Sequence, residues 1–457
     1  MNIGTKAATI ASRLAAHAVG TRWSDLPAEA IASSKRMALD TLAVAWAGSS
    51  APGIPPVREM MIEEGGKPES IVWSTAIRLP ARTAAFLNSA AAAALDYDGM
   101  RATERGSVHA DSVVLPAALA VAEHEHRSGQ ELVAALVVGN DIVTRLGAAS
   151  SLPHKGWYHT SIYGIFGATA AAARLLGLDE DATCHAFGLA ANQASATQLP
   201  NIARSLAKRF SSSFAAQSGV LAAMLAARGI TASRESFEGR FGFYDLYQRG
   251  EPDLLFAGLG REFPHVTTGI KRYPSCACNH TAIEAALHLA REFPVTAADI
   301  TSLEVTISPY VHRLCGAPFE PASDPQVAAQ FSIQYSVAAA LVRRRFGLAD
   351  IQDAAVLDPG IVRIAQSVKV NVDEAWGNSR AATVTRCSRV HGKQTWHVES
   401  IPGSAESPLS DLDLRAKVLD CLQSGALPLS RKHADRLVER VNQLELLDDA
   451  ARLLEDA

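Results

Sequence analysis

The feature of this sequence that most constrains its fold is a change in the spacing of apolar residues near Pro264. From residue 5 to about residue 260, alanine- and leucine-rich segments recur at three- and four-residue spacing between short Gly or Pro breaks, which predicts a helical bundle. Asp25, before Pro27, is expected to open a helix that Gly48 closes. Other helices are expected at the N-terminus and near residues 83–95, 113–125, 130–147, 161–176 and 213–228.

After Pro264 the apolar residues alternate with a period of two and many are β-branched. Strands are expected at 302–308, 367–373, 382–390 and 395–400, with helices at 281–292 and 329–345. This mixture favours helices packed on a small antiparallel sheet. Helical spacing returns from about residue 410, so the tail is expected to pack back onto the bundle. The predicted fold class is therefore mainly α: a large all-helical domain over residues 1–266, completed by 400–457, with an inserted smaller α+β lid domain at 267–399.

The composition excludes several classes of partner. Among 457 residues, 43 basic and 47 acidic side chains give a net charge of −4, which provides no basic field for nucleic acid or an anionic membrane. Polar residues interrupt the apolar N-terminus, unlike a secretory signal, and no window reaches the roughly 18 apolar residues of a membrane span. Six scattered cysteines are typical of reduced thiols. We therefore expect a cytoplasmic protein.

Common catalytic and nucleotide-binding motifs do not occur in the sequence. GxGxxG after a strand, GxxxxGK[ST], HExxH and GxSxG are all missing, which disfavours nucleotide-binding, zinc-protease and esterase functions. What remains is four polar clusters at the ends of predicted elements, where a rigid scaffold can present side chains to a cleft.

The first cluster lies between two predicted helices. Asp96 and Asp98 follow the first helix, at an end where the helix dipole disfavours carboxylates, and His109 precedes the second. A carboxylate near a histidine can form an acid/base or orienting pair. The alternative is a solvated loop in which the two aspartates form salt bridges with Arg101 and Arg105.

The second and third clusters each precede a helix N-terminus, whose free N–H groups attract anions. In the second, His159 follows two aromatic residues, and the alternative is a buried histidine that caps the helix. In the third, Lys208 and Arg209 precede Ser211 and two further serines, so cations, hydroxyls and backbone donors could converge on one anion. The alternative there is a solvated basic turn with a serine N-cap.

The fourth cluster brings Lys271, Arg272, Cys276 and His280 within ten residues at the first boundary of the α+β region. Such a density of polar side chains at an interdomain seam is typical of a ligand pocket. A metal site would need Cys276, Cys278 and His280 together and has no evident fourth ligand, so we expect no metal.

Taken in order, the four clusters resemble the MmgE/PrpD family, and the similarity covers nearly the whole chain. The segments that carry it are LDYD with the later His109 and VLP, YHT through RLLGLD, KRF with the following AA, and KRYPSCACNHTAIEA. The chain departs from the family pattern at Gly99 and Met100 and at residues 211–214, which predicts a reshaped pocket.

The resemblance implies a helical bundle with an α+β lid, a homodimer, a site in the cleft between the two domains, and no metal or organic cofactor. The catalytic residues that it implies by position are Asp96, His109, Lys208, Lys271 and Tyr310. We expect substrate binding by His159, Arg272, Cys276, His280 and Ser211. Members of the family act on small polycarboxylates by moving protons on carbons next to carboxylates.

A carbon acid beside a carboxylate reacts only if a base lies close and the developing negative charge is neutralised in place. We expect Lys208, Lys271 and Arg272 to neutralise that charge, with Asp96 and His109 moving protons and Tyr310 assisting departure or orientation. The predicted function is a cofactor-independent lyase, a dehydratase or decarboxylase, that acts on a small di- or tricarboxylate. The alternatives are an epimerase of an iminodisuccinate-like dicarboxylate and a noncatalytic carboxylate-binding protein.

Overall fold

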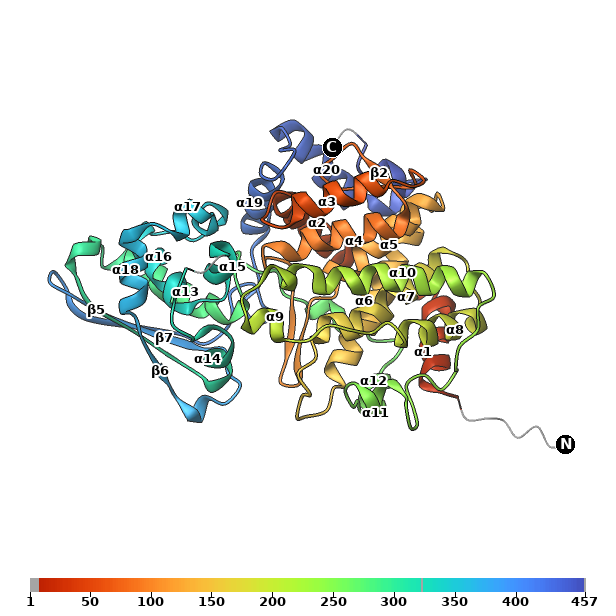
Figure 1. The fold of residues 1–457 in the computed structure, drawn as a ribbon, viewed down its shortest axis with the longest axis horizontal. Coiled ribbons are helices and arrows are strands. Elements are labelled where there is room, and N and C mark those ends of the chain that lie inside the picture. The colour runs from red at the N-terminus through yellow and green to blue at the C-terminus, as the bar shows by residue number, and fades with distance from the viewer. Residues whose placement is uncertain (1–7, 322–323, 456–457) are drawn as a thin grey trace.

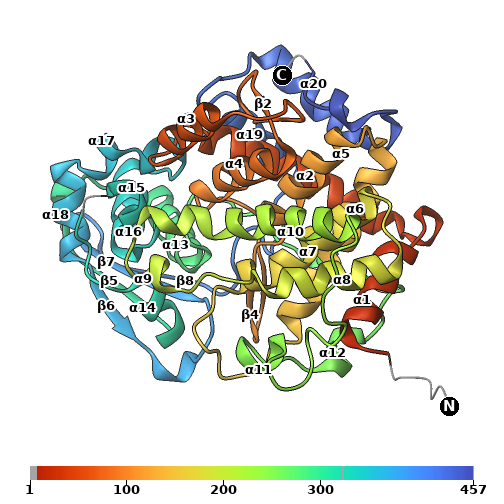
Figure 2. The same cartoon turned by 45° about the vertical axis from the view of Figure 1, so that its right-hand side comes forward.

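The computed structural model describes residues 8–321 and 324–455, and the chain is mainly α-helical (Figures 1 and 2). The N-terminal part holds a bundle of long helices with a few short ones in the connecting segments. Its helices are α1 (Ile10–Gly20), α2 (Ala28–Gly48), α3 (Ile54–Glu64), α4 (Ala81–Ala94), α5 (Asp111–His124), α6 (Gly129–Ala148), α7 (His159–Leu175), α8 (Glu180–Ala191), α9 (Leu199–Ile202), α10 (Ser211–Ala227), α11 (Phe243–Leu246) and α12 (Pro252–Phe256).

Helix α7 lies at the centre of this bundle, packed on α6, α10 and α5. It is apolar around most of its circumference, as expected for a helix with neighbours on every side. Glycines allow the close approach: a Cβ on Gly167 would lie 2.6 Å from the carbonyl oxygen of Gly139 on α6, and one on Gly219 of α10 would lie 2.5 Å from Ala168. The five bundle helices predicted from residue 83 to residue 228 are confirmed.

The start of α2 differs from the prediction. Asp25 ends a short 3-10 turn, Trp23–Asp25, and its carboxylate accepts a hydrogen bond from the backbone N of Arg22 at 2.9 Å. Pro27 is the N-cap of α2, so the prediction that Asp25 opens this helix is wrong. The reason is that the aspartate caps the preceding turn, whose backbone donor lies nearer in sequence.

The second part of the chain contains a four-stranded sheet in the order β6-β5-β7-β8. Its strands are β5 (Ile300–Ile307), β6 (Lys369–Val372), β7 (Ala382–Ser388) and β8 (Gly392–Val398). β5 pairs antiparallel with β7, and β7 with β8, but β6 runs parallel to β5, so the prediction of an antiparallel sheet is wrong at this pair. The cause is the long helical crossover between the two strands, which returns the chain to the end of the sheet where β5 began.

Six helices accompany the sheet: α13 (His280–Glu292), α14 (Pro309–Cys315), α15 (Pro325–Gln330), α16 (Ile333–Arg343), α17 (Asp353–Val356) and α18 (Pro359–Ser367). α13 packs on β7 and β8, and α16 packs between α13 and α18. The helix expected at 329–345 is confirmed over Ile333–Arg343, but it begins later than predicted, because α15 ends at Gln330 and Ser332 caps a new helix by accepting from the backbone N of Tyr335.

The C-terminal helices α19 (Asp411–Leu422) and α20 (Arg431–Asn442), blue in Figure 1, return to the bundle and pack on α2. Lys417 of α19 forms a buried ion pair with Asp40 of α2, with 2.7 Å between Nζ and Oδ1. We retain as a proposal the division into a helical domain, residues 1–266 with 400–457, and an inserted lid, residues 267–399. Among the described helices, one segment, Leu206–Ala227, has the length and composition to cross a membrane, and 56% of its apolar window is buried, as in a core helix.

Candidate active site

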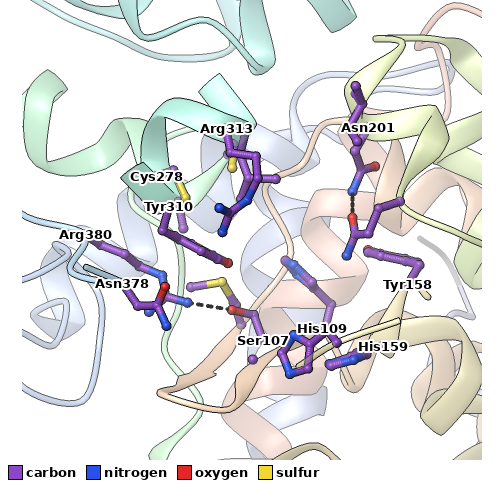
Figure 3. A pocket seen from close by; sticks show the side chains of 18 of the residues that line it. Ser107, His109, Tyr158, His159, Asn201, Cys278, Tyr310, Arg313, Asn378 and Arg380 are labelled. Carbon is purple, nitrogen blue, oxygen red and sulfur yellow. Dashed lines mark hydrogen bonds between the residues drawn. The ribbon is translucent and has the colours of Figure 1, made fainter. Parts of the chain in front are cut away.

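A cavity of about 920 Å³ opens between the helical bundle and the sheet region. Its wall takes side chains from both parts of the chain: Asp96, His109, His159 and Lys208 from the bundle side, and Tyr310, Arg313 and Arg380 from the sheet side. Figure 3 shows Tyr310, Arg313 and Arg380 facing His109, Ser107 and Tyr158 across the cavity. Segments that are far apart in the sequence therefore meet at one place.

Asp96 lies at the C-terminus of α4 and binds two lysines. Its φ of +49° turns the chain sharply after the helix, so its carboxylate lies inside the molecule. Lys208 Nζ contacts Asp96 Oδ1, and Lys271 Nζ lies 3.1 Å from Oδ2 and donates to the Asp96 carbonyl oxygen at 2.7 Å. All three side chains are at most 5% exposed. Burial of these charges is tolerable because each cation has an anionic partner.

Asp98 and His109 form the second pair of this cluster, with 3.3 Å between Oδ2 and Nδ1. Burial raises the pKa of both aspartates, but their cationic neighbours more than offset it, so each pKa lies below its usual range. Lys208 and Lys271 lower the pKa of Asp96, and His109 and Lys271 lower that of Asp98. Both groups are therefore carboxylates at neutral pH, and Asp98 can orient the imidazole of His109.

The alternative of a solvated loop is wrong. Both aspartates are at most 3% exposed, and neither binds the nearby arginines. Arg101 donates from Nε to Thr267 Oγ1 at 2.9 Å, and Arg105 pairs with Glu251. The segment forms a hairpin of β3 (Arg101–Thr103) and β4 (Gly106–Val108), which the sequence analysis missed because its strands are only three residues long.

The hairpin places His109 at the cavity and is fixed to the start of α7. The backbone N of His109 donates to Thr160 Oγ1 at 3.1 Å. Gly106, with φ of +133°, lets the hairpin lie against His159: a Cβ there would be 2.8 Å from His159 Nδ1. The first two clusters are thus in direct contact.

His159 is the first residue of α7, on the cavity wall, and is 4% exposed. Burial and the neighbouring His154, whose ring centroid lies 4.3 Å away, lower the pKa of His159 to about 3. The imidazole is therefore neutral near pH 7. Within the part of the chain that the structure describes, its Nε2 has no hydrogen-bond partner. His159 is buried and lines the cavity, but the alternative of a capping histidine is wrong, because Tyr158 is the N-cap of α7 and no side chain caps this helix.

The third cluster is not a solvated turn. Lys208 and Arg209 are both buried, at 4% and 1% exposed. Arg209 faces away from the cavity, where it donates to the carbonyl oxygen of Pro52 and, from Nη2, to Gln326 Oε1 at 2.7 Å. Only Lys208 of this pair lines the cavity.

Three predicted substrate-binding residues do not line the cavity: Arg272, His280 and Ser211. Arg272 is 40% exposed and lies 3.6 Å from Asp413. His280 is fully buried, and its pKa is lowered to about 4 by burial and by the charge of Lys271. Of the set, only Cys276 and His159 are on the wall. The metal interpretation of the fourth cluster has no geometric support, since no group of three or more His, Cys, Asp or Glu among the described residues could hold an ion.

Two arginines of the wall are not among the predicted site residues. Arg313 and Arg380 flank the ring of Tyr310, with 5.7 Å and 5.0 Å from guanidinium carbon to ring centroid. Arg313 could have been found from its spacing, three residues after Tyr310 on α14, which puts both on one helix face. No local signal marks Arg380, which precedes β7 in an irregular segment.

Two family models match the chain along most of its length. Residues 12–254 match the MmgE/PrpD N-terminal domain, and residues 273–444 match the MmgE/PrpD C-terminal domain. The chain is also 28% identical to a cis-aconitate decarboxylase of Aspergillus terreus, over 84% of this chain and 82% of the relative. It is 27% identical to the cis-aconitate decarboxylase of Homo sapiens, over 95% of this chain and 91% of the relative.

Proposed function

The chain belongs to the MmgE/PrpD family, and from that premise we propose that it is a lyase that removes carbon dioxide from a small polycarboxylate. The curated relatives, which are named as cis-aconitate decarboxylases, favour decarboxylation over dehydration. Epimerisation is the runner-up, because it needs the same proton transfers without loss of a group.

The observation that carries the proposal is the convergence of Asp96, Lys208, Lys271, His109 and Tyr310 on one cavity. Ammonium groups that are already oriented by Asp96 can stabilise negative charge as it develops, with no reorganisation during the reaction. His109, whose Nδ1 lies 3.3 Å from Asp98 Oδ2, is placed to transfer a proton. Paired lysines and an oriented imidazole are the parts that such a reaction requires.

The reaction breaks the bond between a carboxylate and its neighbouring carbon. Carbon dioxide leaves, and the bonding electron pair shifts through the neighbouring C=C bond onto a carbon that bears a remaining carboxylate, which delocalises the charge. Lys208 and Lys271 stabilise this charge, and His109 then delivers a proton to the carbon. Tyr310, on the opposite wall, orients the substrate through its hydroxyl. Neutral His159 can donate or accept one hydrogen bond without adding charge.

The proposal is tested by incubating the full-length chain with cis-aconitate and related di- and tricarboxylates in D₂O while following proton signals and released carbon dioxide. We expect a new olefinic product, deuterium on one carbon, and carbon dioxide in equal amount. Deuterium uptake without loss of carbon would identify an epimerase, a new olefin without carbon dioxide a dehydratase, and an unchanged but protected ligand a binding protein.

A further inference from the structure

Arg313 and Arg380 are cations on the cavity wall that form no ion pair with any residue that the structure describes. Both guanidinium groups lie beside the ring of Tyr310, and Arg380 also interacts with the Tyr310 hydroxyl and donates from Nη2 to the hydroxyl of Ser107 at 3.0 Å. A guanidinium has five N–H donors, so Arg380 retains donors beyond its contacts with Ser107 and Tyr310.

The two lysines of the wall differ from these arginines. Lys208 and Lys271 both contact Asp96, and Lys271 also lies 4.0 Å from Asp98. Two ammonium groups and two carboxylates therefore compensate one another. Among the residues that the structure describes, Arg313 and Arg380 are the wall lysines and arginines without a carboxylate partner, so they can neutralise an anion.

The backbone around Arg380 is fixed before any ligand arrives. Ser308 Oγ, at the start of α14, donates to the carbonyl oxygen of Ser379 at 2.6 Å, and Thr281 Oγ1 of α13 donates to that of Arg380 at 2.7 Å. The contact with Ser107 then directs the guanidinium to the β3–β4 hairpin, two residues before His109. Figure 3 shows this hydrogen bond between Arg380 and Ser107, with His109 beside it. Arg380 is therefore a preorganised cation next to the proposed proton donor.

We propose that Arg380, assisted by Arg313, binds a second carboxylate of the substrate, separate from the group that reacts near Lys208 and Lys271. A guanidinium suits this task because its planar fork can bind a carboxylate through two parallel hydrogen bonds. The inference rests on the proposed function and adds a selectivity rule. The site takes acids with at least two carboxylates that span the cavity, and discriminates against monocarboxylates.

The test uses propane-1,2,3-tricarboxylate, a saturated acid that has no double bond to stabilise the charge left by decarboxylation, with butyrate as the monocarboxylate. Dissociation constants are measured by calorimetry for the full-length wild type, R380Q, R380K and R389Q. Arg389 is a matched control because it is exposed at the other end of β7, roughly 30 Å away at about 3.3 Å per residue of strand.

We expect R380Q to weaken tricarboxylate binding by roughly 10- to 100-fold, the range for losing hydrogen bonds to a charged group. R380K keeps the charge without the fork and should lose about 3- to 10-fold. R389Q should bind like the wild type, and butyrate should bind R380Q and wild type within about twofold. Thermal unfolding verifies that each variant folds. If R380Q does not fold, the comparison of R380K with the wild type still tests the proposal.

Equal tricarboxylate binding by the wild type and both Arg380 variants would overturn the inference, as would failure of the wild type to bind the tricarboxylate. A failure of the proposed function gives a different result from a failure of the carboxylate subsite. If the wild type releases no carbon dioxide from any polycarboxylate, yet its tricarboxylate binding depends on Arg380, the carboxylate subsite stands and the lyase assignment falls.

Discussion

The two walls of the cavity carry similar numbers of cations but arrange them differently. On the bundle wall, Lys208, together with Lys271 from the start of the inserted region, is buried against Asp96, so these charges are compensated and their positions fixed. On the sheet wall, Arg313 and Arg380 stack beside an aromatic ring with no carboxylate partner among the described residues. We infer that the two lysines, which Asp96 holds in place, stabilise charge that develops during the reaction. The two arginines have no carboxylate partner, so they can bind an anionic group of the substrate.

The sharpest test of the bundle wall is His109→Ala. Loss of a positioned proton donor should lower kcat by about 10²- to 10⁴-fold, whereas KM should change little if the sheet wall binds the substrate. Steady-state kinetics with the polycarboxylate that the wild type decarboxylates will measure both values. His126→Ala is the control, since His126 is 75% exposed and pairs with Asp449 at the surface. Retention of wild-type kcat by His109→Ala would remove His109 from the mechanism.

Lys208→Met tests whether the bundle wall is also a structural unit. The substitution leaves Asp96 with one cation in a buried site, and breaking a buried pair in this way typically costs about 3–5 kcal/mol of unfolding free energy. Urea or thermal unfolding will measure the loss. A control is Lys369→Met, whose side chain is 67% exposed and whose Nζ lies 4.0 Å from Glu304. Equal stability of the two variants would show that the Asp96 cluster is solvated.

The decrease in unfolding free energy at acid pH should depend on the two carboxylates of this cluster, Asp96 and Asp98. The pKa values of Asp96 and Asp98 are lowered in the folded protein, so the unfolded chain binds protons first as pH falls. Their contribution is complete above pH about 4 and decreases below it by at most about 1.4 kcal/mol per pH unit for each carboxylate. Unfolding free energies of wild type and Asp98→Asn between pH 3 and 7 test this. An identical slope below pH about 4 in both proteins would contradict it.

Gly106→Ala tests how the hairpin orients His109. A methyl group would meet His159 Nδ1 at 2.8 Å on a backbone of φ +133°, so a loss of about 1–3 kcal/mol in stability is expected, together with a lower kcat. Gly156→Ala is the control, because Gly156 also has a positive φ but nothing lies near its Cβ position. It therefore shows the effect of backbone strain without a steric clash. Equal kcat in the two variants would show that contact with His159 does not position the hairpin.

Arg105→Ala should have the smallest effect. The ion pair between Arg105 and Glu251 lies at the surface, with side chains 35% and 47% exposed, so its loss should change stability by less than about 1 kcal/mol. Activity should be unchanged, because neither aspartate of the first cluster binds this arginine. A large loss of kcat would mean that the hairpin depends on this pair, which calorimetric unfolding and kinetics would together reveal.

The sequence by itself determined the mainly helical bundle and the approximate ranges of α4, α5, α6, α7 and α10, because apolar spacing of three and four residues is a local property of each helix. It also identified the residues of the bundle wall, since Asp96, His109 and Lys208 each lie in a polar cluster at the end of a helix. The short hairpin and the break at Gln330 went unrecognised because their local signals are weak.

Only the tertiary structure decided which charges compensate one another. Asp96 and Lys208 are 112 residues apart, and Asp96 and Lys271 are 175 apart, so no spacing in the sequence relates them. The same holds for Arg380, which reaches Ser107 across 273 residues, and for Arg272 and His280, which lie beside Lys271 in sequence yet off the cavity wall. The physical reason is that a charge acts over a few ångströms in space, whereas periodicity in a sequence reports only the neighbours along one element.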